Sequence, residues 1–245
     1  MNFFSLFKRK VYYFFKFKTN IDIIKNDKSS LEDLFSYFVT DKADFIDNKK
    51  SHGYTKFYLR HLKKFKNKKI NILEIGSFSG ASAAAFAKFF KKAKVFCLDI
   101  NISNFKYYSK KIKVYGLDAC NQNDVEKFFN DNNIKNNKPF FDIIIDDGSH
   151  NLTDMLIAFR IFFEKLKSNG FYIIEEYKFP NYYDHLNDRN EITINKFYKK
   201  ILDKKLFKSK IINYSFQKII FNQIKKVYPH TGNDKKAGII FFNKK

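Results

Sequence analysis

The chain has 245 residues, a formal net charge of +22 and 44% hydrophobic residues. That length and hydrophobic share argue against a disordered chain and allow one substantial α/β domain with its own core. Its 2 cysteines form no CxxC pair and its 5 histidines are scattered, which argues against a zinc site and a disulfide framework. Reduced thiols fit a cytoplasmic protein.

The positive charge comes almost wholly from lysine, and the lysines are spread along most of the chain. Nucleic acids and anionic membranes both attract such a charge. A uniform spread is more typical of a basic, solvated surface than of a binding patch. We therefore expect no specific nucleic acid partner.

Residues 1–18 mix aromatic and basic side chains. The basic residues that interrupt the apolar run are Lys8, Arg9, Lys10, Lys16 and Lys18. These interruptions exclude a membrane-spanning helix and the uninterrupted core of a signal peptide. An aromatic and basic helix of this kind lies on a membrane surface, on a partner subunit or on the main domain. We find no clean apolar face at helical spacing, which disfavours the membrane interpretation.

Residues 19–68 are expected to form helices and loops. One helix is predicted over residues 29–40, with a capping pattern that begins at Ser30, and another over residues 54–66. From residue 69 onward, short apolar runs alternate with helical patterns. The predicted strands are 70–75, 95–98, 113–117, 142–145 and 171–174, and the predicted helices are 81–91, one from about 123, and 153–166.

This alternation is typical of βαβ units. We predict a Rossmann-like, doubly wound, mostly parallel seven-stranded sheet with helices on both faces. Residues 191–205 are expected to be helical, and residues 216–221 and 238–242 to be two closing antiparallel strands. The predicted division is an N-terminal helical extension and cap over residues 1–68 and a single domain over residues 69–245.

A glycine turn follows the first of these strands. Gly76 and Gly80 allow a tight turn before a helix whose first N–H groups are free for a ligand. Phe78 stands where a GxGxxG motif has its middle glycine, so a pyrophosphate would be cradled poorly. Asp99 ends the next strand, where a carboxylate accepts both hydroxyls of a ribose, and Asp118 follows the third strand, near an adenine amino group. Acids here and few phosphate-binding features favour a nucleoside without phosphates, such as S-adenosylmethionine.

A second group of acids follows the later strands. Asp147, Glu175 and Glu176 come directly after apolar runs, where the carboxyl ends of adjacent strands meet. Three converging carboxylates repel one another unless a proton or a cation intervenes, and hard oxygen ligands favour Mg²⁺ or another such divalent cation. His150 follows Asp147 closely, and a histidine imidazole ordinarily titrates near neutral pH, so His150 is the candidate general base for a hydroxyl proton. The alternative is that Ser149 or Asn151 caps the next helix and His150 is a loop residue.

With these motifs the chain resembles the class I S-adenosylmethionine-dependent methyltransferases. It is similar to the metal-dependent sugar O-methyltransferases typified by the macrolide-tailoring macrocin and mycinamicin enzymes. The matching elements are Asp41-Lys42, His52-Gly53-Tyr54-Thr55 with Tyr58, Leu73-Glu74-Ile75-Gly76, Leu98-Asp99-Ile100, Ile144-Ile145-Asp146-Asp147-Gly148-Ser149-His150 and Ile174-Glu175-Glu176.

The resemblance implies Asp147, Glu175 and Glu176 as metal ligands and His150 as general base. The expected cofactor-binding residues are Glu74, Gly76, Ser77, Gly80, Asp99, Ile100, Asp118 and Asp146. The family usually has Glu-Asp where this chain has Glu175-Glu176. Residues 177–190 would face the substrate. His52 and Tyr54 either close over the cofactor or cap and pack a helix.

The leading hypothesis is O-methylation of a sugar hydroxyl in a bacterial surface glycan or a small glycoside. An RNA or other small-molecule methyltransferase is a second hypothesis, but Asp146-Asp147-Gly148 replaces the Asp/Asn-Pro-Pro-aromatic element of amino-group methylation. A third is a catalytically silent scaffold that binds a membrane or a partner through its basic N-terminus. A location at the inner membrane face and a homo-oligomer both stay open.

Overall fold

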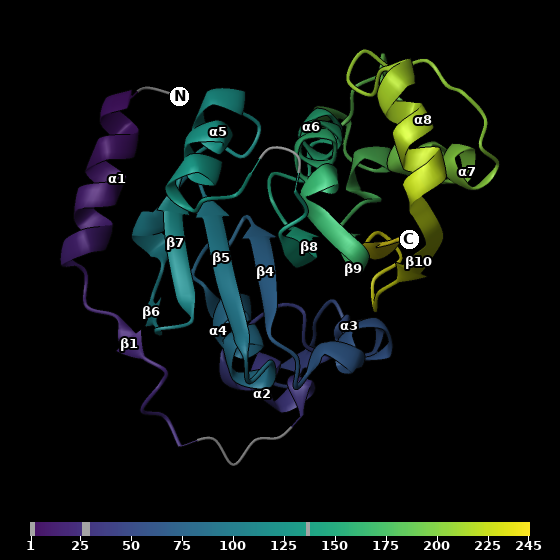
Figure 1. Ribbon diagram of the computed structural model, residues 1–245. Coiled ribbons are helices and arrows are strands. Elements are labelled where there is room, and N and C mark those ends of the chain that lie inside the picture. The colour runs from purple at the N-terminus through teal and green to yellow at the C-terminus, as the bar shows by residue number, and fades with distance from the viewer. Residues whose placement is uncertain (1–2, 26–29, 136–137) are drawn as a thin grey trace. The chain divides into compact units, whose positions relative to one another are not determined.

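The computed structural model describes residues 3–25, 30–135 and 138–245, so Met1, Asn2 and Ser29 of the predicted N-terminal elements lie outside the described residues. The chain divides into two compact units, Met1–Phe128 and Phe129–Lys245 (Figure 1). The predicted division near residue 68 stays a prediction.

Three parallel strands form the centre of the first unit. They are β4 (Ile70–Ile75), β5 (Ala93–Asp99) and β7 (Ile112–Gly116), with β5 between the other two. Helix α4 (Ala81–Phe89) follows β4 and packs on β5. Its alanine-rich sequence favours a helix and lets it approach the strands closely. The predicted strands and helix are confirmed here, with β5 beginning two residues earlier than expected.

Two further helices of this unit were also predicted correctly. The first, α2 (Leu31–Tyr37), begins where the Ser30 hydroxyl oxygen accepts the N–H of Asp33 at 3.1 Å. That bond satisfies one of the free N–H groups of a first helical turn. The second, α3 (Thr55–Leu62), continues into a short 3-10 turn, η1 (Lys63–Phe65).

The remaining elements of the first unit are short, apart from its N-terminal helix. Helix α1 (Phe3–Phe15) packs on η2 (Ile102–Asn104). Two small ladders are formed by the strand pairs β1 (Thr19–Asn20) with β6 (Tyr107–Tyr108) and β2 (Phe45–Ile46) with β3 (Lys49–Lys50).

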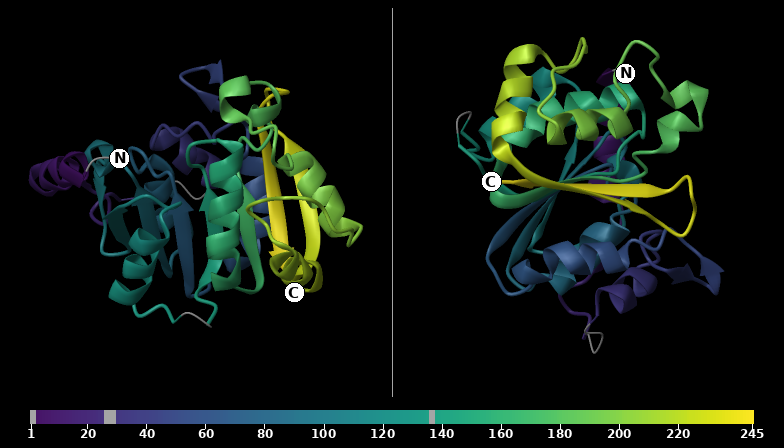
Figure 2. Two further views of the ribbon diagram at one scale, coloured as in Figure 1. Left: turned by 90° about the horizontal axis from the view of Figure 1, so that it is seen from above. Right: turned by 90° about the vertical axis from the view of Figure 1, so that its right-hand side faces the viewer.

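The second unit contains four strands and several helices. Strand β8 (Phe141–Asp146) pairs in parallel with β9 (Leu166–Ile174), and β9 pairs antiparallel with β11 (Gly238–Lys244). Strand β10 (Ile224–Thr231) lies beside β11 as a long antiparallel ribbon (Figure 2). The helices are α5 (Gln122–Asp131), which spans the boundary in sequence, and α6 (Leu152–Phe162), α7 (Ile194–Leu202) and α8 (Tyr214–Gln223).

The prediction of a strand over residues 216–221 was wrong. These residues lie inside α8, which begins where the side-chain oxygen of Asn213 accepts the N–H of Phe216 at 2.9 Å. Phe216 and Ile220 are buried and four residues apart, which is helical spacing. The strand that precedes β11 is β10, whose polar sequence with Pro229 gave no strand signal. Proline is tolerated there because β10 ends the strand order.

The strand order along the chain's sheet is β10-β11-β9-β8-β4-β5-β7. This is the mostly parallel, seven-stranded order predicted for a Rossmann-like fold, with the antiparallel strands at one end. None of the described helices has the length and apolar character needed to cross a membrane.

Candidate functional site

In the first unit, the turn after β4 has three residues in the left-handed region: Gly76 (φ 81°), Phe78 (φ 42°) and Gly80 (φ 78°). Phe78 therefore adopts a backbone conformation that glycine would adopt without strain, and its side chain is exposed. A Cβ atom at Gly80 would lie 2.4 Å from Cζ of Phe105. Gly80 thus leaves the space that the Phe105 ring fills.

The carboxylate of Asp99 organises this turn. Its Oδ2 accepts the N–H of Phe78 at 2.7 Å, and its Oδ1 accepts the N–H of Asn101 at 2.6 Å. A carboxylate oxygen has two lone pairs, so both atoms keep acceptor capacity for a ribose hydroxyl. The next residue, Ile100, accepts a hydrogen bond from the Arg9 guanidinium at its carbonyl, at 3.0 Å.

Asp118 lies two residues beyond the end of β7. Its Oδ1 accepts the N–H of Cys120 at 2.9 Å, which is the geometry of a side-chain turn before a helix. This contact accounts for an aspartate at the position without any ligand. The predicted contact of Asp118 with adenine stays a prediction.

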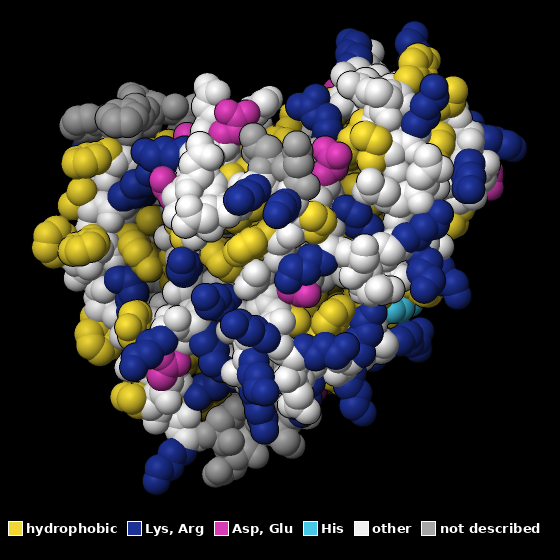
Figure 3. All heavy atoms as spheres, in the orientation of Figure 1, with side chains coloured by type: hydrophobic (Ala, Val, Ile, Leu, Met, Phe, Trp, Pro, Cys, Tyr) yellow, Lys and Arg dark blue, Asp and Glu magenta, His cyan; other side chains and the backbone are white. Residues whose placement is uncertain are grey.

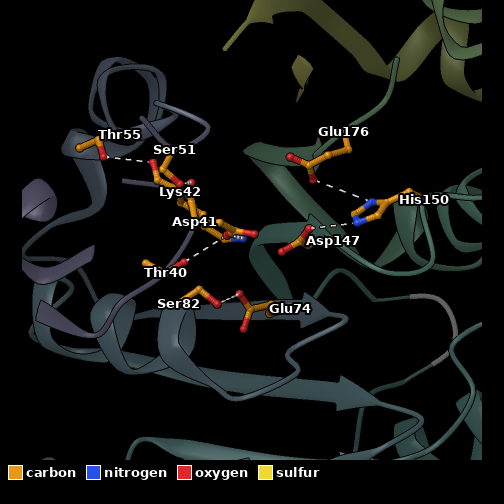
Figure 4. A network of polar contacts seen from close by, with 10 residues as sticks. All are labelled: Thr40, Asp41, Lys42, Ser51, Thr55, Glu74, Ser82, Asp147, His150 and Glu176. Atoms are coloured by element: carbon orange, nitrogen blue, oxygen red, sulfur yellow. Dashed lines mark hydrogen bonds and ion pairs between the residues drawn. The ribbon is translucent and has the colours of Figure 1, made fainter. Parts of the chain in front are cut away.

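Glu74 is fully buried at the carboxyl end of β4. The hydroxyl of Ser82 donates to its Oε1 at 2.5 Å, and its Oε2 has no hydrogen-bond partner among the residues that the structure describes (Figure 4). The hydroxyl of Ser77 donates to its main-chain carbonyl at 3.3 Å. Burial raises the pKa of the Glu74 carboxyl, and the positive charge of Lys42 acts in the opposite direction. A buried carboxylate oxygen with free acceptor capacity fits the amino group of a cationic ligand.

Sequence reasoning gave Lys42 no role. Its side chain is only 1% exposed, and its ammonium lies 3.9 Å from Oδ1 of Asp41. A buried ammonium is costly unless acidic groups compensate it, and Glu74 is one such group. The Asp41-Lys42 match to the family was the only signal that could have drawn attention to it.

In the second unit, strand β8 ends at Asp146. Burial raises the pKa of the Asp146 carboxyl to about 7, while the N–H of Gly148 acts to lower it. This acid is therefore partly protonated at neutral pH. Its predicted place beside the cofactor is not tested by any contact in the structure.

The next residues of the second unit form a compact cluster. One ligand atom each from Asp147, His150 and Glu176 lies within 4.8 Å of the others. Nε2 of His150 is 3.9 Å from Oδ1 of Asp147, and its Nδ1 is 3.8 Å from Oε2 of Glu176 (Figure 4). The ring of Phe179 packs edge-on against the imidazole, with centroids 5.6 Å apart. The imidazole therefore lies with a carboxylate facing each ring nitrogen.

Backbone strain marks two members of this cluster. His150 has φ 57° and Glu176 has φ 47°, both in the left-handed region. Residues with a side chain avoid that region unless the surroundings enforce it, and such strain is concentrated at functional sites. Asn151 does cap α6, since its side-chain oxygen accepts the N–H of Thr153 at 2.9 Å. The helix cap at Asn151 and the acidic cluster around His150 are both present, so the cap does not argue against a catalytic role for His150.

Glu175 is not part of the cluster. It is buried, and its N–H donates to the carbonyl of Asp146 at 2.9 Å. Its role as a metal ligand stays a prediction. The donor set bears on the kind of metal: carboxylates alone favour Mg²⁺ or Ca²⁺, whereas an imidazole ligand shifts the preference toward transition metals. Oxygen ligands from Asp147 and Glu176 fit a divalent cation in either case.

Comparisons with known proteins bear on the sequence motifs of both units. Residues 73–177 match the family model described as a methyltransferase domain. This segment of the chain is therefore similar in sequence to a methyltransferase domain. The matched segment includes the glycine turn of the first unit and the acidic cluster of the second, and the resemblance inferred from the motifs is confirmed.

Two curated relatives are sugar O-methyltransferases by name. The chain is 30% identical over 156 residues to mycinamicin VI 2''-O-methyltransferase of Micromonospora griseorubida, which covers 61% of this chain and 36% of that protein. It is 35% identical over 132 residues to L-olivosyl-oleandolide 3-O-methyltransferase of Streptomyces antibioticus, which covers 51% and 32%. The chain thus matches about a third of the length of these relatives.

A solved structure extends the match in fold. MycE methyltransferase from the mycinamycin biosynthetic pathway, in complex with Mg, SAH and mycinamycin VI, aligns with a TM-score of 0.67 at 20% identity. The alignment covers 89% of this chain and 55% of that chain. At this identity the match establishes a shared Rossmann-like fold and no more.

Proposed function

We propose that the protein is an S-adenosylmethionine-dependent O-methyltransferase that acts on a sugar hydroxyl with the help of a divalent cation, with His150 as general base. The observation that carries the proposal is the cluster of Asp147, His150 and Glu176, whose ligand atoms lie within 4.8 Å of one another. The sugar O-methyltransferases among the relatives support the choice of reaction and acceptor.

The carboxylates of Asp147 and Glu176 would hold the cation, and Glu175 is the further predicted ligand. When bound, such an ion binds substrate hydroxyls and lowers the pKa of one of them. The carboxylates of Asp147 and Glu176 repel each other at this separation, and the positive charge of a bound divalent cation would offset that repulsion.

His150 would take the proton of the reacting hydroxyl. The hydroxyl oxygen bonds to the methyl carbon of the cofactor as the carbon–sulfur bond breaks, and that electron pair stays on sulfur. The proton passes to the imidazole, and the carboxylates of Asp147 and Glu176, each facing one ring nitrogen, stabilise the resulting imidazolium. The Phe179 ring limits rotation of the imidazole.

On the cofactor side, Glu74 would recognise the amino group, and Asp99 the ribose. Gly76, Ser77 and Gly80 provide the turn that lets the backbone approach the ligand. Ile100, Asp118 and Asp146 are the remaining predicted cofactor residues. The free acceptor capacity of the buried Glu74 Oε2 is the feature that favours a cationic ligand here.

The proposed acceptor is a sugar of a bacterial surface glycan or a small glycoside, methylated in the cytoplasm. The loop of residues 177–190 supports a sugar substrate because it presents Tyr182 and Tyr183. The ammonium of Lys236 lies 5.9 and 5.2 Å from their ring centroids. Aromatic faces of this kind suit the apolar face of a sugar ring, and the ammonium of Lys236 adds a hydrogen-bond donor.

Removal of the metal is the first test. Purified protein, a panel of nucleotide-linked sugars and glycosides, and labelled cofactor would be assayed before and after treatment with EDTA. We expect methyl transfer to stop with the chelator and to return with added Mg²⁺ or Mn²⁺. Methyl transfer that continues in EDTA would remove the metal from the proposal.

Substitution of His150 is the second test, with His230→Ala on β10 as the matched control. As a general base, His150 contributes on the order of 10²–10⁴ in kcat, so His150→Ala should lose that factor. Cofactor affinity by calorimetry and the Mg²⁺ concentration for half-maximal activity should stay unchanged. A raised Mg²⁺ requirement, with activity rescued by excess metal, would make His150 a ligand and contradict the base assignment.

A further inference from the structure

Helix α1 carries an apolar stripe that faces away from the rest of its unit. Phe7, Val11, Phe14 and Phe15 lie on one side of the helix, since they follow the i, i+4, i+7, i+8 spacing, and they are 41–82% exposed. The sequence had suggested that no clean apolar face repeats here. Apolar residues do occur on both sides of α1, and the structure shows which of them face outward. We call these four residues the α1 stripe.

The inward face of α1 is the one that carries polar anchors. The Arg9 guanidinium donates to the carbonyl of Ile100 at 3.0 Å, and the Lys16 ammonium donates to the carbonyl of Ser103 at 2.9 Å. Between them the Tyr13 ring packs edge-on against Phe105, with centroids 6.3 Å apart. A helix on a water-soluble domain ordinarily turns its apolar stripe inward and its charges outward. In α1 two cationic groups fasten the helix, and the side chains of Phe7, Val11, Phe14 and Phe15 are left in solvent.

The charge around the α1 stripe defines the chemistry of its partner. Lys8 and Lys10 are exposed on the helix, and the first 21 residues contain no Asp or Glu. In Figure 3, hydrophobic side chains gather over α1 at the left of the molecule, with basic side chains beside them. A second copy would bring the same positive charge to the contact and be repelled. A surface that is apolar inside and negatively charged at its boundary complements both features.

We propose that α1 docks on an anionic phospholipid bilayer, with the α1 stripe inserted at the boundary of head groups and acyl chains. Lys8 and Lys10 then contact lipid phosphates, and Phe17, which is exposed two residues after the end of the helix, extends the apolar contact. The anchoring bonds of Arg9 and Lys16 keep the first unit fixed to the docked helix. This inference does not depend on methyl transfer or on the metal cluster.

Vesicle binding tests the proposal directly. The full chain would be sedimented with vesicles of phosphatidylcholine alone, or of phosphatidylcholine with an equal share of phosphatidylglycerol, at about 0.15 M salt. We expect binding to the anionic vesicles and none to the neutral ones. Replacing Phe14 and Phe15 together by Ser should abolish binding, and Lys8→Gln or Lys10→Gln should each weaken it about fivefold.

A matched pair of substitutions controls for general loss of apolar surface. Leu206→Ser with Tyr214→Ser removes two exposed apolar side chains from the second unit and should leave vesicle binding unchanged. The chain contains no Trp, so Phe15→Trp places a single reporter on the stripe. Its emission should shift to the blue with anionic vesicles and be quenched by brominated lipid.

Three results would overturn the proposal. They are an absence of binding to anionic vesicles, equal binding to neutral and anionic vesicles, and binding that survives the Phe14 and Phe15 substitutions. Sedimentation velocity without lipid tests the alternative that the α1 stripe binds a second copy of the chain. A dimer that those same substitutions dissociate would assign the stripe to that second copy.

Discussion

Replacing Gly80 by Ala should destabilise the first unit, through two effects that the structure separates. The backbone at Gly80 has φ 78°, where a residue with a side chain costs about 1–2 kcal/mol. The new Cβ would also lie 2.4, 2.6 and 2.8 Å from three atoms of the Phe105 ring. Phe105 is fully buried, so the ring has little room to move, and overpacking of this kind costs about 1–3 kcal/mol. The expected total loss is about 2–5 kcal/mol in the free energy of unfolding.

Urea denaturation of four proteins measures both effects: the unsubstituted chain, Gly80→Ala, Phe105→Ala and the double variant. Phe105→Ala alone leaves a cavity and should cost about 3–5 kcal/mol. In the double variant the methyl group has space, so the combined loss should be smaller than the sum by about 1–3 kcal/mol, which is the steric part. Strictly additive losses, or a Gly80→Ala variant as stable as the parent, would refute the reasoning.

Two further substitutions test buried polar groups. Because burial raises the pKa of Glu74 above its ordinary value of 4.5, the folded state holds this proton where the unfolded state has lost it, and stability falls as the pH rises above 4.5. Glu74→Gln removes that loss. As the pH rises above 4.5, the unfolding free energy of the variant should therefore increase relative to that of the unsubstituted chain, by at most about 1.4 kcal/mol per pH unit. A difference between the two proteins that does not change with pH would contradict this. The buried Gln217 exchanges hydrogen bonds with the N–H and C=O of Phe207, at 3.0 and 2.8 Å, and donates to the carbonyl of Ile212 at 2.9 Å. Gln217→Ala should cost roughly 3 kcal/mol or more, while the exposed Asn222→Ala on the same helix should cost less than about 0.5 kcal/mol; similar losses in both would refute the role of these bonds.

The secondary structure of the chain could be predicted from the sequence wherever burial follows a simple local pattern. Strands β4, β5 and β8 are short apolar runs with turn residues after them, and the alanines of α4 favour a helix in any context. The pattern failed at residues 216–221, because a run of six residues is too short to distinguish the spacing of a helix from the alternation of a strand. The Asn213 cap three residues before Phe216 was the signal that favours a helix.

By itself the sequence determined the alternation of strands and helices from residue 70 to residue 174, the positions of acids at strand ends and the methyltransferase motifs, because each depends on residues close together in the chain. Only the tertiary structure decided which side chains meet. It placed Glu176 with Asp147 and His150 and left Glu175 out of that cluster, since left-handed backbone at His150 and Glu176 redirects side chains in a way that no local pattern encodes.

The same limit applies to α1. Aromatic residues occur on both of its sides, so the sequence does not say which side is buried. That choice depends on distant partners: the carbonyls of Ile100 and Ser103 hold Arg9 and Lys16 inward, and the α1 stripe is thereby turned to the outside.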